Sequence, residues 1–176
     1  NLARNAAVEF GEGVAFFSLE MTDMELTDRL IASESGISAD KLKGKVKMNP
    51  EEWVVLEQSI KRLVKAPLYI DETPGITLTE FTAKAKRLVR EKGVKIIFVD
   101  YLQLMHSGKP QQGGFSKVQE VTEISNTLKT TAKDLKVPII ALAQLNRNLM
   151  SRAGSNGKPV LSDLKDSGSI EQDADM

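Results

Sequence analysis

The chain has 176 residues, and its 24 lysines and arginines balance 24 aspartates and glutamates, so the formal net charge is zero. A balanced charge gives no general argument for a nucleic-acid or membrane partner, so any such binding must come from local patches. Cysteine is absent and His106 is the only histidine, which excludes disulfides, thiolate metal sites and multi-histidine metal sites. No apolar stretch reaches the roughly 18 to 20 residues that span a bilayer, and no signal peptide opens the chain. We expect one soluble, cytoplasmic domain with no membrane segment.

The first ten residues have the apolar spacing of a helix, which Gly11 and Gly13 close. No cap or turn precedes Asn1, so we expect the chain to begin inside a helix that follows a strand. Residues 170–176 stop without a strand partner. We therefore expect residues 1–176 to form a partial domain that is truncated at both ends.

Four short apolar runs are rich in branched or aromatic residues and do not alternate with polar ones. This pattern is typical of strands that are buried on both faces of a parallel sheet. The runs are 14–17, 68–70, 96–99 and 137–143, and they lead to the polar or acidic residues Glu20, Asp71, Asp100 and Gln144. Ligands in open α/β sheets bind just beyond the carboxyl ends of the strands, so these residues are candidates for a site.

Helix starts separate the apolar runs. Each start has an N-cap residue and, three positions later, an acid or glutamine: Thr22 with Glu25, Asn49 with Glu52, Thr77 with Glu80, and Ser116 with Gln119. Alternating strands and helices predict right-handed βαβ units, and hence an α/β fold with a mostly parallel sheet and helices on both faces. Segments 107–114 and 146–159 follow strand ends and are interpreted as functional loops.

Asp100 ends the run KIIFVD, where P-loop NTPases carry an acid that holds Mg²⁺ through coordinated water. Helix capping is an equally good explanation of this aspartate. Glu20 can lie beside Asp100 if their strands are neighbours, and it can then orient a water molecule as a general base. The simpler alternative is an acid favoured by the dipole of the following helix.

The other conspicuous side chains have weaker claims to a role. Gln144 can donate a hydrogen bond to a terminal phosphate or merely satisfy loop backbone. Asp71 begins a strong turn signal, and that turn already explains it. His106 is interpreted as a loop histidine, and Trp53 as a core residue or a subunit contact.

Together these segments resemble a known family. The segments FFSLEM (16–21), IIFVDYLQLM (96–105), VPIIALAQLNR (137–147) and SDLKDSGSIEQDAD (162–175) closely resemble the motor domain of DnaB-type replicative DNA helicases. The resemblance runs in order along essentially the whole chain. It implies a RecA-like P-loop NTPase fold in a homo-hexamer that couples ATP hydrolysis, with Mg²⁺, to translocation on single-stranded DNA and to unwinding at the replication fork. It also implies a primase and a helicase loader as partners.

The resemblance assigns roles to nucleotide-site residues by position. Glu20 matches the catalytic carboxylate that polarises the attacking water, and Asp100 matches the Walker B acid on Mg²⁺. Gln144 matches the glutamine that senses the γ-phosphate and links hydrolysis to DNA contact. Arg29 matches an arginine that reaches the nucleotide phosphates; without the family it would be read as a solvated helix residue.

The resemblance also assigns a DNA-binding loop. Lys165, Asp166 and Gly168 match the segment that grips the single strand. The family more commonly has Arg-Glu at the first two of these positions; lysine keeps the charge but loses the bidentate fork. From composition alone, an acidic solvated tail would be the preferred reading of this segment.

Part of the expected active site is missing from the sequence. The Gly-rich loop that ends in Gly-Lys-Ser/Thr is absent, and the arginine finger is expected downstream of Met176. We therefore predict that the isolated chain does not hydrolyse ATP. Two alternatives remain open at this point: another RecA-fold ATPase, such as a recombinase or a clock-type ATPase, and a non-catalytic interaction domain with a degenerate ATPase fold.

Overall fold

A computed structural model describes residues 1–108, 116–145 and 168–175 of the chain. In this part a four-stranded parallel sheet has the order β2-β1-β3-β4. The strands are β1 (Gly13–Ser18), β2 (Leu68–Asp71), β3 (Val94–Asp100) and β4 (Ile139–Ala141). All four apolar runs thus form strands, and the predicted parallel sheet is confirmed.

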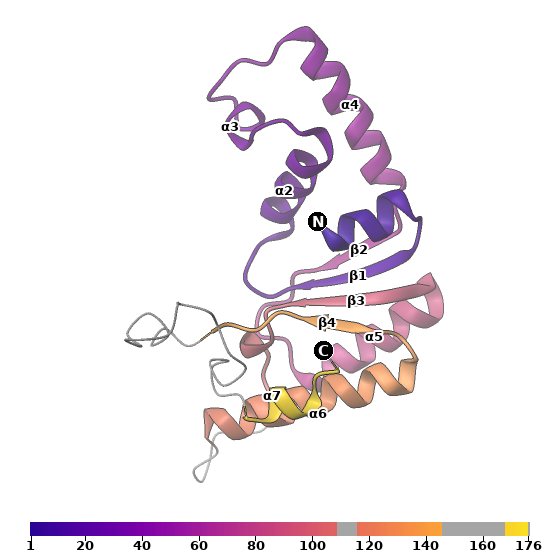
Figure 1. Cartoon of the computed structure of the whole chain (residues 1–176), viewed down its shortest axis with the longest axis vertical. Coiled ribbons are helices and arrows are strands. Elements are labelled where there is room, and N and C mark those ends of the chain that lie inside the picture. The colour runs from indigo at the N-terminus through magenta and orange to yellow at the C-terminus, as the bar shows by residue number, and fades with distance from the viewer. Residues whose placement is uncertain (109–115, 146–167, 176) are drawn as a thin grey trace.

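Helices cover both faces of the sheet, as predicted (Figure 1). On one side lie α1 (Leu2–Arg4), the π-helix η1 (Asn5–Glu9), α2 (Asp23–Ser35), α3 (Ala39–Leu42) and α4 (Pro50–Lys65), of which η1 packs directly on β1. The other face carries α5 (Leu78–Lys92), α6 (Lys117–Leu135) and α7 (Gly168–Asp173), while the short 3₁₀ helix η2 (Leu102–Leu104) follows β3. None of the helices in the described ranges combines the length and hydropathy needed to cross a membrane.

Local sequence signals fix the ends of the long helices. Capping boxes open α2, α4, α5 and α6, and their N-cap residues are Thr22, Asn49, Thr77 and Ser116. Each N-cap side chain accepts a hydrogen bond from the backbone amide of the third helical residue. The backbone amide of the N-cap residue donates one to the side chain of that third residue. Such caps satisfy amides that the first helical turn leaves without a partner. Gly36 and Gly93 end α2 and α5 in the left-handed region, with φ of 71° and 66°.

The sheet is buried on both faces, which explains why the strand sequences do not alternate. Toward α5 and α6, Phe17 packs edge-on against Phe81 with ring centroids 4.8 Å apart, and both side chains are fully buried. Toward α1 and η1, a smaller cluster of Ala3, Ala7, Val14 and Phe98 joins the first helical segment to the sheet. The predicted helix over the first ten residues is therefore part of the domain core.

Of the two interpretations of Trp53, the core residue is wrong, and the subunit contact stays a prediction. Leu56 is buried, but Trp53 and Val64 are 57% and 80% exposed. The helix packs against α2 and η1, and its first half stands away from the sheet (Figure 1). Apolar spacing shows which side chains share a face of a helix, but it does not show what covers that face.

Candidate functional site

Strands β1 and β3 are direct neighbours, which is the condition that the sequence left open for Glu20 and Asp100. Ser18 pairs with Asp100 in the parallel register, and the Leu19 amide donates a hydrogen bond of 2.8 Å to the Asp100 carbonyl. Glu20 follows at once and is exposed, whereas Asp100 is half-buried. The two carboxylates therefore belong to adjacent strand ends at the carboxyl edge of the sheet.

Strand β4 brings the third candidate to the same edge. Val99 pairs with Ala141, and the Leu142 amide donates to the Val99 carbonyl at 2.9 Å. In return the Leu102 amide donates to the Leu142 carbonyl at 3.0 Å. Gln144 follows this junction and is exposed. The ends of three neighbouring strands thus carry an acid, a second acid and an amide.

Asp71 ends the outer strand β2 and is engaged in a turn, as predicted. Its carboxylate accepts hydrogen bonds from the Thr73 amide at 3.1 Å and from Lys84 Nζ at 2.6 Å. Burial by itself raises the pKa of Asp71, but the hydrogen bonds from Lys84 and Thr73 outweigh it and hold that pKa below its ordinary value. This carboxylate joins β2 to α5 through its ion pair with Lys84.

Arg29 lies on α2, the helix that begins just after Glu20. It is exposed and lines a cavity of about 190 Å³ between α2 and α3, together with Glu25, Asp28 and Lys43. Among the described residues Arg29 forms no hydrogen bond or ion pair. The structure therefore does not join Arg29 to the strand-end residues, and its assignment to the nucleotide phosphates stays a prediction.

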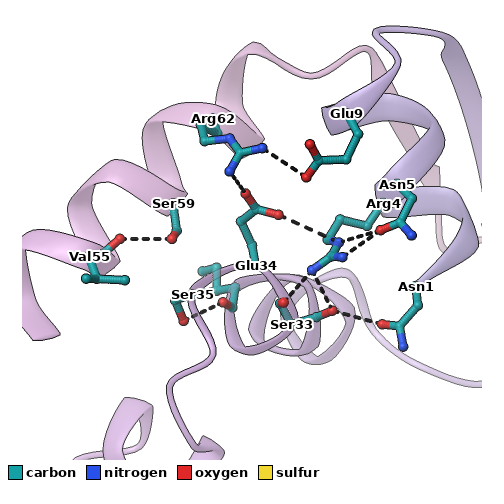
Figure 2. A network of polar contacts seen from close by, with 11 residues as sticks. Asn1, Arg4, Asn5, Glu9, Ser33, Glu34, Ser35, Val55, Ser59 and Arg62 are labelled. Atoms are coloured by element: carbon teal, nitrogen blue, oxygen red, sulfur yellow. Dashed lines mark hydrogen bonds and ion pairs between the residues drawn. The ribbon is translucent and has the colours of Figure 1, made fainter.

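A polar network that no sequence pattern predicted holds α2 in place (Figure 2). The Glu34 carboxylate, only 2% exposed, pairs with Arg62 of α4 at 2.8 Å and with Arg4 of α1 at 3.6 Å. Arg4 also donates to the Ser33 carbonyl and hydroxyl, and Arg62 reaches Glu9 at 3.0 Å. These contacts tie the first helical segment to α2 and α4, and they fix the helix that carries Arg29.

Gln103 is a second residue that sequence reasoning missed. It lies in η2, three residues after Asp100, and only 9% of it is exposed. Its side chain forms hydrogen bonds with both the amide and the carbonyl of Gln144. A polar residue inside the apolar segment 101–105 was the available signal, because a buried amide needs partners.

The DNA-loop candidates are only partly covered by the structure. Lys165 and Asp166 lie outside the described residues, as does segment 146–159. Gly168 opens α7, which packs against α6 and buries Ile170 in the core. Asp175 beyond α7 pairs with Lys129 of α6, so the end of this motif is anchored to the domain.

The donor set at the strand ends suits Mg²⁺. The described residues contain no group of three or more histidine or carboxylate side chains able to cage a metal ion. Asp100 is a single carboxylate at a strand end. Mg²⁺ usually keeps several waters and is held by one or two carboxylates plus substrate phosphates, so one acid beside a nucleotide is a fitting site.

Comparison with known proteins identifies the family. The model of the DnaB-like helicase C-terminal domain matches residues 1–176. The chain belongs to this family. The replicative DNA helicase DnaB of Geobacillus stearothermophilus is 43% identical over 177 residues, which cover the whole chain and 38% of that protein. The replicative DNA helicase DnaC of Bacillus subtilis is 42% identical over the same length and share.

Solved structures agree with the family. A DnaB-like replicative helicase, described with its interactions with primase, matches 98% of the chain with a TM-score of 0.87 at 33% identity, and the match covers 41% of its own chain. A separately solved ATPase domain matches with the same score and identity, and the match covers 60% of that chain. The fold is therefore the RecA-like α/β fold that the resemblance implied. The matches favour the helicase over a recombinase or clock-type ATPase, and the chain spans well under half of the curated DnaB relatives named above.

Proposed function

We propose that this chain is part of the motor of a hexameric replicative DNA helicase, which couples ATP hydrolysis to translocation on single-stranded DNA and to duplex unwinding at the fork. One observation carries the proposal: Glu20, Asp100 and Gln144 lie at or just beyond the ends of β1, β3 and β4, three neighbouring strands of one parallel sheet. In open α/β sheets this edge is where ligands bind. Membership of the DnaB-like family supports the same reading.

The three side chains have distinct tasks in this proposal. Asp100 would hold the hydrated Mg²⁺ of the nucleotide, and the bound ion would supply positive charge near the phosphates. Glu20 accepts the proton of the water that attacks the γ-phosphorus while the bond to the bridging oxygen breaks. The side-chain amide of Gln144 donates a hydrogen bond to the γ-phosphate, and Arg29 supplies positive charge to the nucleotide phosphates.

The sequence holds only part of this active site. It contains no Gly-Lys-Ser/Thr loop, whose amides and lysine cradle the phosphates in P-loop NTPases. We therefore propose that the 176-residue chain alone does not hydrolyse ATP. This statement would be contradicted if the purified chain hydrolysed ATP in the presence of Mg²⁺ and the substitution Glu20→Gln abolished that activity.

The DNA contact is assigned to Lys165, Asp166 and Gly168. The lysine charge and the small residues of this segment suit a phosphate backbone, and the segment contains no aromatic residue that would stack on bases. A single lysine per subunit binds weakly, but a hexameric ring places several along one strand. A primase and a helicase loader are proposed as partners, and one solved relative is described with its interactions with primase.

The direct test is unwinding of a forked DNA duplex by the full-length protein that contains this chain. We expect unwinding that requires ATP and Mg²⁺, and its loss in Glu20→Gln with nucleotide binding retained. The matched control is Glu12→Gln, an exposed acid before β1 at the opposite edge of the sheet, which should unwind normally. Binding of partners without any ATP-dependent unwinding would favour the non-catalytic alternative.

A further inference from the structure

The side chain of Gln103 forms two hydrogen bonds with the backbone of Gln144, as a neighbouring strand would. Its Oε1 accepts a hydrogen bond from the Gln144 amide at 3.1 Å, and its Nε2 donates one to the Gln144 carbonyl at 3.3 Å. The pairing of β3 with β4 ends at Val99 and Ala141. Beyond that pair the Leu102 amide still donates to the Leu142 carbonyl, and the Gln103 side chain then adds two hydrogen bonds to the backbone of Gln144.

We propose that Gln103 is a positioning residue that fixes the backbone of Gln144 and so aims the Gln144 side chain at the nucleotide. The inference rests on the proposed function, in which Gln144 senses the γ-phosphate. The Gln144 side chain is exposed and has no hydrogen-bond partner among the described residues. The backbone therefore limits the region that this side chain can reach, and both polar groups of that backbone form hydrogen bonds with Gln103.

The chemistry of this contact needs a glutamine. Gln103 is buried, and its carboxamide carries one donor group and one acceptor, which match the carbonyl and amide of Gln144. Glutamate of the same length accepts from the amide but offers no donor to the carbonyl when it is ionised. Asparagine keeps both groups but is one methylene shorter, and methionine keeps the approximate length without either hydrogen bond.

A second layer holds Gln103 itself. Lys117 Nζ, in the first turn of α6, donates to the Gln103 carbonyl at 3.3 Å and to the buried Glu120 carboxylate at 2.9 Å. The other Glu120 oxygen accepts from the Ser107 amide at 3.3 Å. A continuous set of polar contacts therefore runs from the end of β4, through η2, to the start of α6. We expect Lys117→Met to give the same defect as loss of the Gln103 contact, but a smaller one.

The activity test uses the full-length protein and the variants Gln103→Met, Gln103→Glu and Gln103→Asn. We expect Gln103→Met to lower kcat for DNA-stimulated ATP hydrolysis by roughly 10- to 100-fold, because small errors in position are costly in catalysis. KM for ATP should change by less than about twofold, because Gln144 acts on the reacting phosphate. Gln103→Glu and Gln103→Asn should fall between Gln103→Met and wild type. The control Gln58→Met, on the exposed surface of α4, should retain full activity.

A double-mutant cycle separates positioning from a general structural role. If Gln103 acts through Gln144, then Gln103→Met should cause no further loss of kcat in a Gln144→Ala background. An equal loss in both backgrounds, or full activity in a folded Gln103→Met protein, would overturn the inference.

Hydrogen exchange tests the contact without reference to activity. We expect the Gln144 amide to exchange roughly tenfold faster in Gln103→Met, since its hydrogen-bond acceptor is gone, while amides of β1 keep their protection. An unchanged exchange rate at Gln144 would overturn the positioning role even if activity fell. Normal ATP hydrolysis in Gln144→Ala, with faster exchange in Gln103→Met, would instead sink the proposed sensor role of Gln144 and leave the backbone contact standing.

Discussion

The Leu19 amide donates a hydrogen bond of 2.8 Å to the carbonyl oxygen of Asp100. This bond belongs to the last residue pair of β1 and β3, Ser18 with Asp100, and its donor immediately precedes Glu20. Segment 19–20 cannot swing away from the end of β3 without breaking it. The base and the metal-binding acid of the proposed site are therefore held at adjacent strand ends by backbone, whatever their side chains do.

Replacement of the proposed metal-binding acid should alter the magnesium dependence of the full-length protein. In Asp100→Asn the hydrated Mg²⁺ loses a charged partner, so we expect the Mg²⁺ concentration at half-maximal ATP hydrolysis to rise roughly 10- to 100-fold. Titration of activity with Mg²⁺ at fixed ATP measures this. Asp134→Asn, at an exposed position on α6, is the control and should match wild type. An unchanged Mg²⁺ requirement in Asp100→Asn would remove the metal role.

The proposed DNA loop should show itself in the salt dependence of binding. Lys165→Ala removes one charge that meets a phosphate, so affinity for single-stranded DNA should fall and the slope of log affinity against log salt should become shallower. Fluorescence anisotropy with an oligonucleotide over a salt series measures both. Lys47→Ala, in an exposed basic run between α3 and α4, removes the same charge and should change neither. Equal effects of the two variants would mean that the loop makes no specific contact.

The Glu34 network should contribute to folding. Glu34→Gln removes the charge that two arginines face, one on α1 and one on α4, and we expect the free energy of unfolding to fall by about 1 to 3 kcal/mol. Denaturant unfolding of the two proteins measures the difference. Glu57→Gln on α4 breaks an exposed pair with Lys61 and should have a much smaller effect, close to the error of the measurement. If the free energy of unfolding falls equally in both variants, then the buried ion pairs of Glu34 stabilise the protein no more than an exposed pair does.

Asp71 gives a prediction about pH. Burial raises its pKa, but the hydrogen bonds from Lys84 and Thr73 hold that pKa below the ordinary value in the folded protein. The stabilising contribution of Asp71 is therefore complete above the pKa of the unfolded chain, about 3.9, and is lost as the pH falls through the lower folded value. The difference in unfolding free energy between wild type and Asp71→Asn should be below about 1 kcal/mol at pH 7 and should vanish in acid.

The same measurement in a Lys84→Met background is the control for Asp71. Without the ammonium group the carboxylate has lost its charged partner. The pH-dependent part of the effect of Asp71→Asn on unfolding free energy should therefore shrink toward zero in this background. A difference that grows as the pH falls would contradict the sign of the pKa shift.

The sequence predicts those parts of the fold that depend on near neighbours in the chain. A capping box needs only two residues three positions apart, as at Thr22 and Glu25, so the helix starts are correct. A short apolar run in the sequence predicts a buried parallel strand. Because parallel strands run in the same direction, their carboxyl ends lie at the same edge of the sheet. The positions of Glu20, Asp100 and Gln144 at one edge therefore follow from local patterns and general rules of α/β folds.

Contacts between residues that are far apart in the sequence cannot be predicted in this way. Gln103 and Gln144 are 41 positions apart, and the Arg4 guanidinium reaches a carbonyl 29 positions away. No spacing rule connects such pairs, because they depend on how whole elements pack. For the same reason the sequence left open whether Trp53 on α4 is a core residue or a subunit contact, since this depends on what lies opposite the helix.

The most direct measurement is a structure of the full-length protein with Mg²⁺ and a non-hydrolysable ATP analogue. We predict that the terminal phosphate lies beyond the carboxyl ends of β1 and β3, with the hydrated metal ion on Asp100 and the Glu20 carboxylate facing the terminal phosphorus. Gln144 should lie within hydrogen-bond reach of a phosphate oxygen. A nucleotide bound at the opposite edge of the sheet, near Gly13, or one whose phosphates contact none of these three side chains, would contradict the proposed site.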